Sequence, residues 1–403
     1  MLKTGRKTAD IVIIGGGIFG ANLVYALAMR GAKHILLLEQ DVLAAGSSSK
    51  AAGGLRQQFA DELDIRFSIE GIRFYERFTR EYAPVEVQDR PPRFFQHGYM
   101  FLCATSESWQ AMQRYVELQQ QLGVPTQLLS PTEVSARVPQ LVVDDLVGAT
   151  FCPTDGYSDP GAMTRTLAQA AREQGVTIQE HTLVTGIKIR QGRVQRVETS
   201  QGSIATPMVI NATGAYAALV ARLVGITDLP VWPLKRQLYQ TEAFEDLPQD
   251  VPMVVDLHTG FHFRRRDDGV VLALPLSVSP EQIMRNKNLE PESFALNTED
   301  SLWPMLQAEV SRRCPTLAQA GIRRAWAGLY EMTPDEHAIL GPTEIEGFLC
   351  GCGFSGHGFM HSPRAARLLA EHILGKQESA SELALFSLER FRSGKLIKTT
   401  SLL

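Results

Sequence analysis

The stretch DIVIIGGGIFGANLVYALAMRGAKHILLLEQ, residues 10–40, decides the fold of this chain. An apolar run at 11–14 is typical of a buried strand and leads directly into the glycine-rich turn GGGIFG at 15–20. A segment of helical periodicity follows, and a second apolar strand ends at Glu39. This order of strand, glycine turn, helix and strand predicts a βαβ unit that binds a dinucleotide.

Each glycine of the Gly15-x-Gly17-x-x-Gly20 pattern has a mechanical role. Gly15 permits the tight turn, Gly17 lets the backbone approach a pyrophosphate, and Gly20 lets the helix pack closely on the strand. The phosphates then lie at the positive N-terminal end of the helix. Glu39, nineteen residues after Gly20, is placed to accept hydrogen bonds from a ribose 2′-OH, and its charge would repel a 2′-phosphate. The pattern therefore predicts FAD or NAD and disfavours NADP.

The composition is that of a globular protein of two to three domain-sized units. The chain has 403 residues, 44% of them hydrophobic, and a net charge of −4 with no basic block, so nothing points to nucleic acid or an anionic membrane. Its apolar runs are much shorter than the ~20 residues of a membrane span. Nine residues precede the stretch that begins at Asp10, too few for a signal or transit peptide. We expect a soluble, cytoplasmic protein.

The five cysteines form no CxxC pair, which predicts reduced, buried thiols rather than a metal or redox motif. Amphipathic helices are expected near 62–81 and 107–122, and the Asp- and Pro-rich stretch 150–160 indicates a crossing between domains. The dipeptides Gln191-Gly192 and Gln201-Gly202 indicate hairpin turns.

Two later segments repeat the pattern of a strand that ends in glycine before a helix. VINATGAYA, within 206–220, ends its strand at Ala212-Thr213-Gly214 and either lies beside the dinucleotide or simply forms core. In the final third, GFLCGC is followed by the loop GFSGHGF and a helical segment. The binding domain is therefore predicted to assemble from three separated segments.

With these segments in place, the chain resembles the FAD-dependent oxidoreductases of the D-amino-acid oxidase and sarcosine oxidase superfamily. Five stretches in the same linear order carry the resemblance: GGGIFG, GSSSKAAGGLRQQF, DGYSDPGAMTRTLAQAAREQGV, VINATGAYA, and TPDEHAILGP followed by CGFSGHGFMHSP. GLRQQF and GFSGHGFM are most similar to the β-subunits of heteromeric sarcosine oxidase and proline dehydrogenase. Glycine oxidase and monomeric sarcosine oxidase are the nearest alternatives.

The resemblance implies an α/β fold in which a Rossmann-like, glutathione-reductase-type FAD domain carries an inserted α+β substrate domain with a mixed sheet. The implied division is an FAD domain of 1–85, 145–225 and 320–385, a substrate domain of 86–144 and 226–319, and a C-terminal tail of 386–403.

The resemblance also implies where FAD lies. The first glycine turn contacts the pyrophosphate, Glu39 the ribose, the serines at 47–49 the phosphate or ribityl oxygens, the backbone of Val184 the adenine, and residues 353–360 the pyrimidine edge of the flavin. A helix that begins near 356–359 offers N–H donors and partial positive charge, which favours the anionic reduced flavin. The residues expected at FAD are Gly15, Gly17, Ile18, Phe19, Gly20, Glu39, Gln40, Gly46, Ser47, Ser48, Ser49, Ala52, Gly53, Gly54, Leu55, Val184, Ala212, Thr213, Gly214, Gly328, Gly353, Phe354, Ser355, Gly356, His357, Gly358, Phe359 and Met360.

Two departures from the family pattern refine this expectation. Monomeric sarcosine oxidases bind FAD covalently through a cysteine where this chain has Gly328, and no histidine occurs within 40–60 for a histidyl linkage, so FAD should be non-covalent. The oxidases carry a lysine beside the flavin, which promotes oxygen reduction, where this chain has Met360. An uncharged methionine favours a dehydrogenase over an oxidase.

Amine oxidation by hydride transfer to flavin N5 requires mainly orientation and an anchor for the substrate carboxylate. Arg56 is the first candidate for the anchor, or for a group over N5, because Arg binds carboxylates bidentately; the alternative is a structural arginine. Tyr330 and His262 occupy positions that line the family's pocket. The alternative for Tyr330 is a core tyrosine with a satisfied hydroxyl, and a sheet-face histidine is an equal alternative for His262. His357 is more readily a loop residue near FAD than a proton shuttle, and Met360 borders the substrate or packs the cavity.

Two charged clusters are expected to be structural. The run Arg264-Arg265-Arg266 is typical of a solvated strand end or turn. Asp335, Glu336 and His337 share a TPDEH turn and point in different directions, so capping is preferred to metal binding and no metal site is expected.

The leading hypothesis is a dehydrogenase of a small secondary or N-methyl amino acid such as sarcosine, dimethylglycine or proline. A partner subunit or an electron-transfer protein would then be the electron acceptor. The alternatives are a peroxide-producing amino-acid oxidase, a dehydrogenase of 2-hydroxy acids or glycerol phosphate, and a catalytically idle flavoprotein that acts in assembly.

Overall fold

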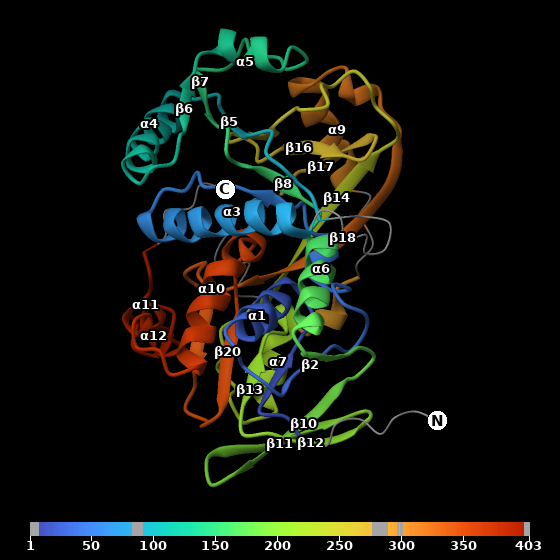
Figure 1. The fold of residues 1–403 in the computed structure, drawn as a ribbon. Coiled ribbons are helices and arrows are strands. Elements are labelled where there is room, and N and C mark those ends of the chain that lie inside the picture. The colour runs from blue at the N-terminus through green and yellow to red at the C-terminus, as the bar shows by residue number, and fades with distance from the viewer. Residues whose placement is uncertain (1–7, 83–91, 276–288, 296–297, 299–300, 399–403) are drawn as a thin grey trace.

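A computed structural model describes residues 8–82, 92–275, 289–295, 298 and 301–398 (Figure 1). The predicted domain boundary between 85 and 86 lies outside these residues, as do residues 1–7 and the end of the predicted tail. Two large sheets occupy opposite ends of the view, and the long helix α3 (Glu62–Tyr82) crosses between them. Helix α3 matches the amphipathic helix predicted near 62–81.

The first sheet has six strands and collects segments from distant parts of the chain. Its order is β19-β20-β13-β1-β2-β9, and all neighbours are parallel except the edge strand β19. The strands are β1 (Ile11–Ile14), β2 (Ile35–Leu38), β9 (Thr177–Gln179), β13 (Val209–Asn211), β19 (Ile339–Pro342) and β20 (Phe348–Cys352). The predicted strand, turn, helix and strand order is confirmed here.

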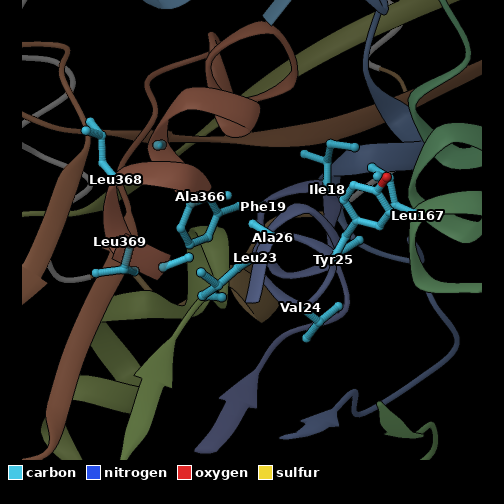
Figure 2. Close-up of a cluster of buried hydrophobic side chains, with 14 of the residues drawn as sticks. Ile18, Phe19, Leu23, Val24, Tyr25, Ala26, Leu167, Ala366, Leu368 and Leu369 are labelled. Carbon is cyan, nitrogen blue, oxygen red and sulfur yellow. The ribbon is translucent and has the colours of Figure 1, made fainter. Parts of the chain in front are cut away.

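Alternate side chains of β1 build two separate layers of core. Ile11 and Ile13 pack beneath α1 (Ile18–Met29), α6 (Pro160–Glu173) and α10 (Gly358–Ile373), as Figure 2 shows for the helical part of this cluster. Val12 and Ile14 face the other side, where a three-stranded antiparallel sheet and α7 (Ala217–Arg222) cover them. Full burial of both faces is the condition under which parallel strands read as continuous apolar runs.

The covering sheet consists of β10 (Val184–Arg190), β11 (Arg193–Thr199) and β12 (Gly202–Ala205). Its first hairpin turns at Gln191 and Gly192, whose φ angles are 52° and 74°. Two positive φ values in a two-residue loop are the mark of a type I′ turn, so the hairpin predicted there is confirmed.

The second sheet has eight strands in the order β18-β14-β17-β16-β15-β5-β7-β6, with only β15 and β5 parallel. The strands are β5 (Tyr99–Cys103), β6 (Gln127–Leu129), β7 (Gly148–Cys152), β14 (Trp232–Thr241), β15 (Met253–Asp256), β16 (His262–Arg266), β17 (Gly269–Ala273) and β18 (Ile322–Met332). Strands β7 and β18 fall in sequence ranges predicted for the FAD domain, yet both pair within this sheet. The two-domain division stays a prediction, and the pairing favours assigning these strands to the second domain.

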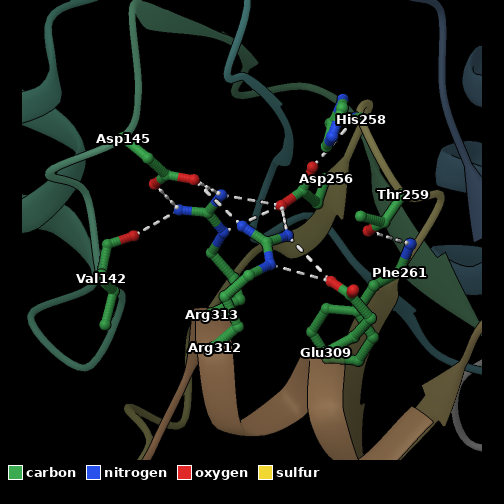
Figure 3. Close-up of polar contacts among 9 residues, drawn as sticks. All are labelled: Val142, Asp145, Asp256, His258, Thr259, Phe261, Glu309, Arg312 and Arg313. Carbon is green, nitrogen blue, oxygen red and sulfur yellow. Dashed lines mark hydrogen bonds and ion pairs between the residues drawn. The ribbon is translucent and has the colours of Figure 1, made fainter. Parts of the chain in front are cut away.

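Helix α9 (Leu302–Arg313) is fastened to the eight-stranded sheet by a buried ionic network (Figure 3). Arg313 and Asp256 have fully buried side chains, and Arg313 Nε donates to Asp256 Oδ2 at 2.9 Å. Arg312 NH2 reaches the same oxygen at 2.6 Å, and Arg313 NH1 contacts Asp145 at 2.7 Å. Because each buried charge has a partner, removal of one member would leave the others uncompensated.

Another small sheet joins β3 (Gly54–Leu55), β8 (Gly156–Ser158) and β4 (Phe94–Phe95). The remaining helices include α2 (Ser47–Lys50), α4 (Ser106–Gln121), α5 (Pro131–Arg137), α11 (Ala380–Leu385) and α12 (Glu389–Arg392). Across the described ranges, no helix combines the length and apolarity that a membrane crossing requires.

Candidate active site

The carboxyl ends of β1, β2, β13 and β20 meet at one edge of the six-stranded sheet. The residues that follow these strands are Gly15, Glu39, Ala212 and Gly353. In open α/β sheets, ligands bind outside this edge. The topology thus brings together four segments that sequence analysis assigned to the dinucleotide.

The glycine turn leaves no room for side chains. Gly15 has φ +112°, and a Cβ there would collide with the carbonyl oxygen of Ala212; a Cβ on Gly20 would collide with the carbonyl oxygen of Gly15. Helix α1 begins at Ile18, whose N–H donates to Ser48 Oγ at 2.9 Å. Other N–H groups of the first helical turn have no intrahelical acceptor, which suits them to bind phosphate.

The carboxylate of Glu39 is held by the backbone at the end of β2. Oε2 accepts the N–H of Gly16 at 2.7 Å, and Oε1 accepts the N–H of Asp41 at 3.0 Å. Gln40 is exposed next to it. Thr182 N donates to the carbonyl oxygen of Glu39, so the chain enters β10 at Val184 only two residues after contacting this turn.

Helix α2 connects the glycine turn with the second sheet. Gly46 is its N-cap, Ser48 contacts α1, and Ser47 Oγ donates to the carbonyl oxygen of Leu329 at 2.6 Å. Ser49 N donates to the carbonyl oxygen of Ala44. A Cβ placed on Gly328 would lie 2.9 Å from Lys50 Cβ, so β18 packs closely on this helix.

The strand register places several reactive side chains on one face of the eight-stranded sheet. Leu234 pairs with Tyr330 and Arg236 with Gly328, so Tyr330 and Arg236 share a face. His262 pairs with Val255 of β15, which in turn pairs with Phe101; Tyr99, two residues before Phe101, therefore faces the same way. The opposite face carries the separate apolar core of this sheet.

The small-residue loop after α2 lies against this face. Ala52 accepts a hydrogen bond from Arg264, and a Cβ on Gly54 would lie 3.1 Å from the Tyr99 ring. Gly53 has φ +79°, and the buried Leu55 closes the short strand β3. The loop predicted at the cofactor thus lies against the face of the eight-stranded sheet that carries Tyr99.

Arg56 is buried at the end of this loop, with 5% of its surface exposed. Its guanidinium donates to the carbonyl oxygen of Gln58 at 2.7 Å, lies 3.8 Å from the centre of the Phe59 ring, and is 3.4 Å from His357 Nε2. Among the residues that the structure describes, no carboxylate lies within ion-pair distance of it. Burial lowers the pKa of Arg56 from its usual value, which indicates a cation that lacks full compensation.

The two glutamines of GLRQQF hold Arg56 in place. The carboxyl group of Asp155 accepts the backbone N–H of Gln57 at 3.0 Å and the side chain of Gln58 at 3.2 Å. Gln58 also donates to the carbonyl oxygen of Tyr99 at 2.9 Å. Burial raises the pKa of Asp155 to about 6. The GLRQQF motif therefore joins the loop to β5 through these hydrogen bonds.

The loop after β20 brings the last predicted segment to the same place. Gly353 and Gly356 have φ of +77° and +90°, and a Cβ on Gly356 would lie 2.5 Å from the Tyr330 ring. Phe354 packs on Phe19 with ring centroids 5.1 Å apart. Ser355 Oγ accepts the N–H of Thr333 at 3.0 Å. Tyr330, Arg56 and this loop thus converge.

Helix α10 starts at Gly358, within the range predicted from the sequence. The carbonyl oxygen of Phe359 accepts the Tyr75 hydroxyl at 2.8 Å, and a Cβ on Gly71 of α3 would collide with the carbonyl oxygen of Met360. The Met360 side chain is buried in the apolar cluster around α1. Close packing on α3 fixes where the helix begins.

Both histidines of the site have lowered pKa values, which favours their neutral forms. His262 Nδ1 donates to the carbonyl oxygen of Gly260 at 2.9 Å, which leaves Nε2 as an acceptor. Burial and the charge of Arg236 lower the pKa of His262. Burial and the charge of Arg56 lower the pKa of His357 well below its usual value.

Sequence analysis does not predict Tyr99, Arg236 or Glu331. The Arg236 guanidinium lies 5.6 Å from the centre of the Tyr330 ring, and Tyr99 is buried on the same face. Glu331 Oε2 accepts the N–H of Gly353 at 2.7 Å, and burial raises the pKa of Glu331 to about 7. Only the cross-strand register shows that Tyr99 and Arg236 lie on this face, and no local sequence pattern indicates Glu331.

The prediction that Arg264, Arg265 and Arg266 form a solvated strand end is wrong. Arg264 and Arg265 are each 4% exposed, and backbone carbonyl oxygens, including those of Ala52 and Phe244, accept their hydrogen bonds. Arg266 forms an ion pair of 3.0 Å with Asp159. A long guanidinium side chain can donate to several backbone carbonyl groups at once. Arg264 and Arg265 therefore provide hydrogen bonds for carbonyl oxygens of turns inside the protein.

The TPDEH turn is structural at Asp335, whose carboxylate binds the buried Arg390 at 2.7 Å. His337 points elsewhere: its Nε2 lies 3.5 Å from Asp64 Oδ1. Single ligand atoms of Asp61, Asp64 and His337 lie within 4.8 Å of one another, a spacing that metal sites share with ordinary hydrogen-bonded clusters.

Comparison with known proteins identifies the group to which this architecture belongs. Residues 10–372 match the sequence profile described as FAD dependent oxidoreductase (DAO). The chain belongs to this family. FAD is accordingly the cofactor, and the α/β fold with its Rossmann-like FAD domain is confirmed.

Three relatives show the range of the similarity. The mitochondrial sarcosine dehydrogenase of Homo sapiens is 30% identical over 91% of this chain and 40% of its own length. The mitochondrial dimethylglycine dehydrogenase of Rattus norvegicus is 27% identical over 92% of this chain and 43% of its own. The crystal structure of L-proline dehydrogenase from P. horikoshii is 30% identical with a TM-score of 0.88 and covers 97% of this chain and 100% of that one. The chain thus spans about two fifths of the two mammalian dehydrogenases.

The residues at the sheet edge fit FAD. Gly15 and Gly20 allow the close approach that a pyrophosphate needs, and the first turn of α1 supplies N–H donors. Glu39 has lone pairs for a ribose beyond its two backbone contacts. The loop at 353–358 adds further backbone donors at the same edge.

Proposed function

We propose that the protein is an FAD-dependent dehydrogenase that oxidises the C–N bond of a small secondary or N-methyl amino acid, of the sarcosine, dimethylglycine or proline type. The single observation that carries this proposal is the buried guanidinium of Arg56, which has no carboxylate partner among the described residues. A buried cation of this kind is stabilised when a carboxylate substrate binds. The named activities of the three relatives support the same substrate class.

Arg56 anchors the substrate and fixes its orientation. A guanidinium offers two parallel N–H donors to a carboxylate, and charge-assisted hydrogen bonds are about twice as strong as neutral ones. The hydrogen bonds of Gln57 and Gln58 to Asp155 restrain the loop that carries the guanidinium. Tyr330 closes the site on the side of the 353–358 loop. A rigid anchor of this kind contributes through orientation rather than through acid–base chemistry.

The amine must be unprotonated before its C–H bond can react. The lowered pKa of His262 favours the neutral form, in which Nε2 is an acceptor, and we assign this residue to take the proton of a bound ammonium group. Nε2 of His357 accepts an Arg56 N–H, and His357 is therefore assigned to hold the anchor. FAD, when bound, accepts the hydride of the substrate.

The electron acceptor is proposed to be a partner subunit or an electron-transfer protein rather than oxygen. Met360 is uncharged and is buried among apolar side chains, so it provides no positive charge for superoxide. FAD is proposed to be non-covalent, because Gly328 carries no thiol and packs against Lys50 Cβ.

The test is anaerobic bleaching of the purified yellow protein by a panel of amines and hydroxy acids, followed by timed re-aeration. Bleaching by sarcosine, dimethylglycine or proline with slow re-oxidation supports the proposal. Rapid re-oxidation with stoichiometric peroxide would identify an oxidase, bleaching by hydroxy acids alone would identify an alcohol-type dehydrogenase, and no bleaching with a stable bound partner would indicate an assembly role. Acid precipitation should release the FAD into solution.

Met360→Lys tests the choice of acceptor directly. It adds the charge that the oxidases have, and we expect re-oxidation by air to become at least tenfold faster. Met360→Leu is the matched control, since it keeps the apolar packing and adds no charge. Equal re-oxidation rates for both variants would contradict the role given to Met360.

A further inference from the structure

The carboxyl group of Glu331 lies at the ligand-binding edge of the six-stranded sheet, although the residue belongs to the other sheet. Its Oε2 accepts the N–H of Gly353 at 2.7 Å. The same oxygen lies 3.9 Å from the position that a Cβ on Gly214 would occupy. Gly353 directly follows β20, and Gly214 lies three residues after β13. Glu331 therefore lies between two of the turns that border the dinucleotide edge.

Among the described residues, three elements lie around this carboxyl group. The loop after β20 presents N–H groups and, one residue before Gly353, the buried thiol of Cys352, which the charge of Glu331 affects. The turn after β13 presents Gly214 and, further along, Tyr216. On β14, Pro233 is directly opposite, and Lys235 follows on the same face of the strand.

Within these surroundings, desolvation is the largest influence on the carboxyl group and raises its pKa to about 7, while the N–H groups of Gly353 and Phe354 act in the opposite direction. Glu331 is therefore mixed between its neutral and charged forms near physiological pH. A second acid, Glu39, lies at the end of β2 on the same edge. Two carboxyl groups therefore lie at this edge.

We propose that Glu331 is the proton-binding residue of the FAD site: it is neutral when FAD is bound, and FAD binding to the apoprotein takes up one proton at its carboxyl group. FAD carries two negatively charged phosphates, which disfavour a further negative charge in a poorly solvated site. Protonation removes that charge and converts one carboxyl oxygen into a hydrogen-bond donor. By this mechanism the site holds FAD more tightly below neutral pH than above it. The inference depends on FAD as the cofactor and not on the substrate proposed above.

The experiment measures the FAD affinity of the apoprotein between pH 6 and 9, from the change of flavin fluorescence on binding and with no substrate present. For the wild type we expect the Kd to rise at least tenfold between pH 6.5 and 8.5. For Glu331→Gln, which keeps an oxygen for the Gly353 N–H but cannot ionise, we expect a Kd that varies less than about twofold. Glu117→Gln, at an exposed position on α4, is the control and should reproduce the wild-type slope.

A second measurement does not depend on any variant. Calorimetry of FAD binding at pH 7.5, in buffers of different ionisation enthalpy, should report the uptake of a substantial fraction of one proton by the wild type. Uptake by Glu331→Gln should be close to zero. The proposal is overturned if the wild-type Kd is flat or tightens as pH rises, if no proton is taken up, or if Glu331→Gln binds FAD with the wild-type pH dependence. None of these results depends on which amine, if any, the protein oxidises.

Discussion

Glu331→Gln should stabilise the apoprotein, and by an amount that depends on pH. The carboxyl group is removed from water between β18, Gly214 and the loop at 353–354, and the backbone N–H groups of Gly353 and Phe354 favour its charged form. Its pKa rises from 4.5 to about 7 on folding. The folded protein therefore holds this proton more tightly than the unfolded chain does. Stability is lost as pH rises from about 4.5 to about 7, because the buried group is then forced to ionise.

The magnitude follows from the pKa difference. The difference between a pKa of 4.5 and one of about 7 corresponds to about 3 kcal/mol, which is the free-energy penalty above pH 7. Near pH 5.5 the penalty falls to about 1 kcal/mol, and near pH 4 it is close to zero. Glutamine never ionises, so the variant should be more stable than the wild type by these amounts. An extra unpaired amide N–H in the variant would add a constant offset of about 1 kcal/mol, which does not change with pH.

Urea unfolding of both apoproteins at pH 4.5, 5.5 and 8, followed by far-UV circular dichroism, measures the difference from the two midpoints and a common slope. We expect the advantage of the variant to grow by at least 2 kcal/mol between pH 4.5 and 8. Glu117→Gln should show no such growth, because its side chain is exposed. An advantage that is the same at all three pH values would refute the assignment of a raised pKa to Glu331.

Three further substitutions test other parts of the structure. Arg56→Lys keeps the charge but removes bidentate contact, so the KM for an amino-acid substrate should rise about 10- to 100-fold with a smaller change in kcat, as steady-state kinetics would show; a rise for uncharged amines as well would argue against carboxylate binding. Gly20→Ala places a methyl group against the carbonyl oxygen of Gly15, so FAD affinity should fall at least tenfold in a fluorescence titration, whereas an unchanged Kd would contradict the close packing. Asp256→Asn leaves Arg313 buried without its main counter-charge, so urea unfolding should show a loss of about 3 kcal/mol, and full stability would mean that Asp145 alone suffices.

The parts of the fold that could be predicted are those whose signals are local. The glycine turn at 15–20 is required by contacts within one βαβ unit, so the pattern itself contains the constraint. The hairpin at Gln191-Gly192 and helix α3 are likewise set by a turn type and by apolar periodicity. The gathering of β1, β13 and β20 into one sheet was predictable because a glycine-bearing turn and a helix follow each of these strands.

What could not be predicted depends on strand register. The burial of Arg264 and Arg265 follows from carbonyl groups of the 244–248 and 52–53 segments, which approach only after the sheets have formed. Arg236 and Tyr330 share a face because β14 and β18 pair over ten residues, and no single segment contains that information. A run of charged residues in a strand is predicted to be exposed to solvent unless the groups that these residues contact are known.

The position of β18 explains how one strand serves both the substrate face and the cofactor edge. Successive side chains of a strand point in opposite directions. Tyr330 therefore faces Arg236 and Gly356, while Glu331 reaches the N–H of Gly353 at the sheet edge. A slip of one residue in the pairing of β18 with β14 would exchange these directions and remove both groups from their places. The pairing of β14 and β18 over many residues thus fixes an aromatic group on one side of β18 and a titratable carboxyl group on the other. The strand that shapes the proposed substrate site is therefore also the strand that carries Glu331, the proposed proton-binding residue.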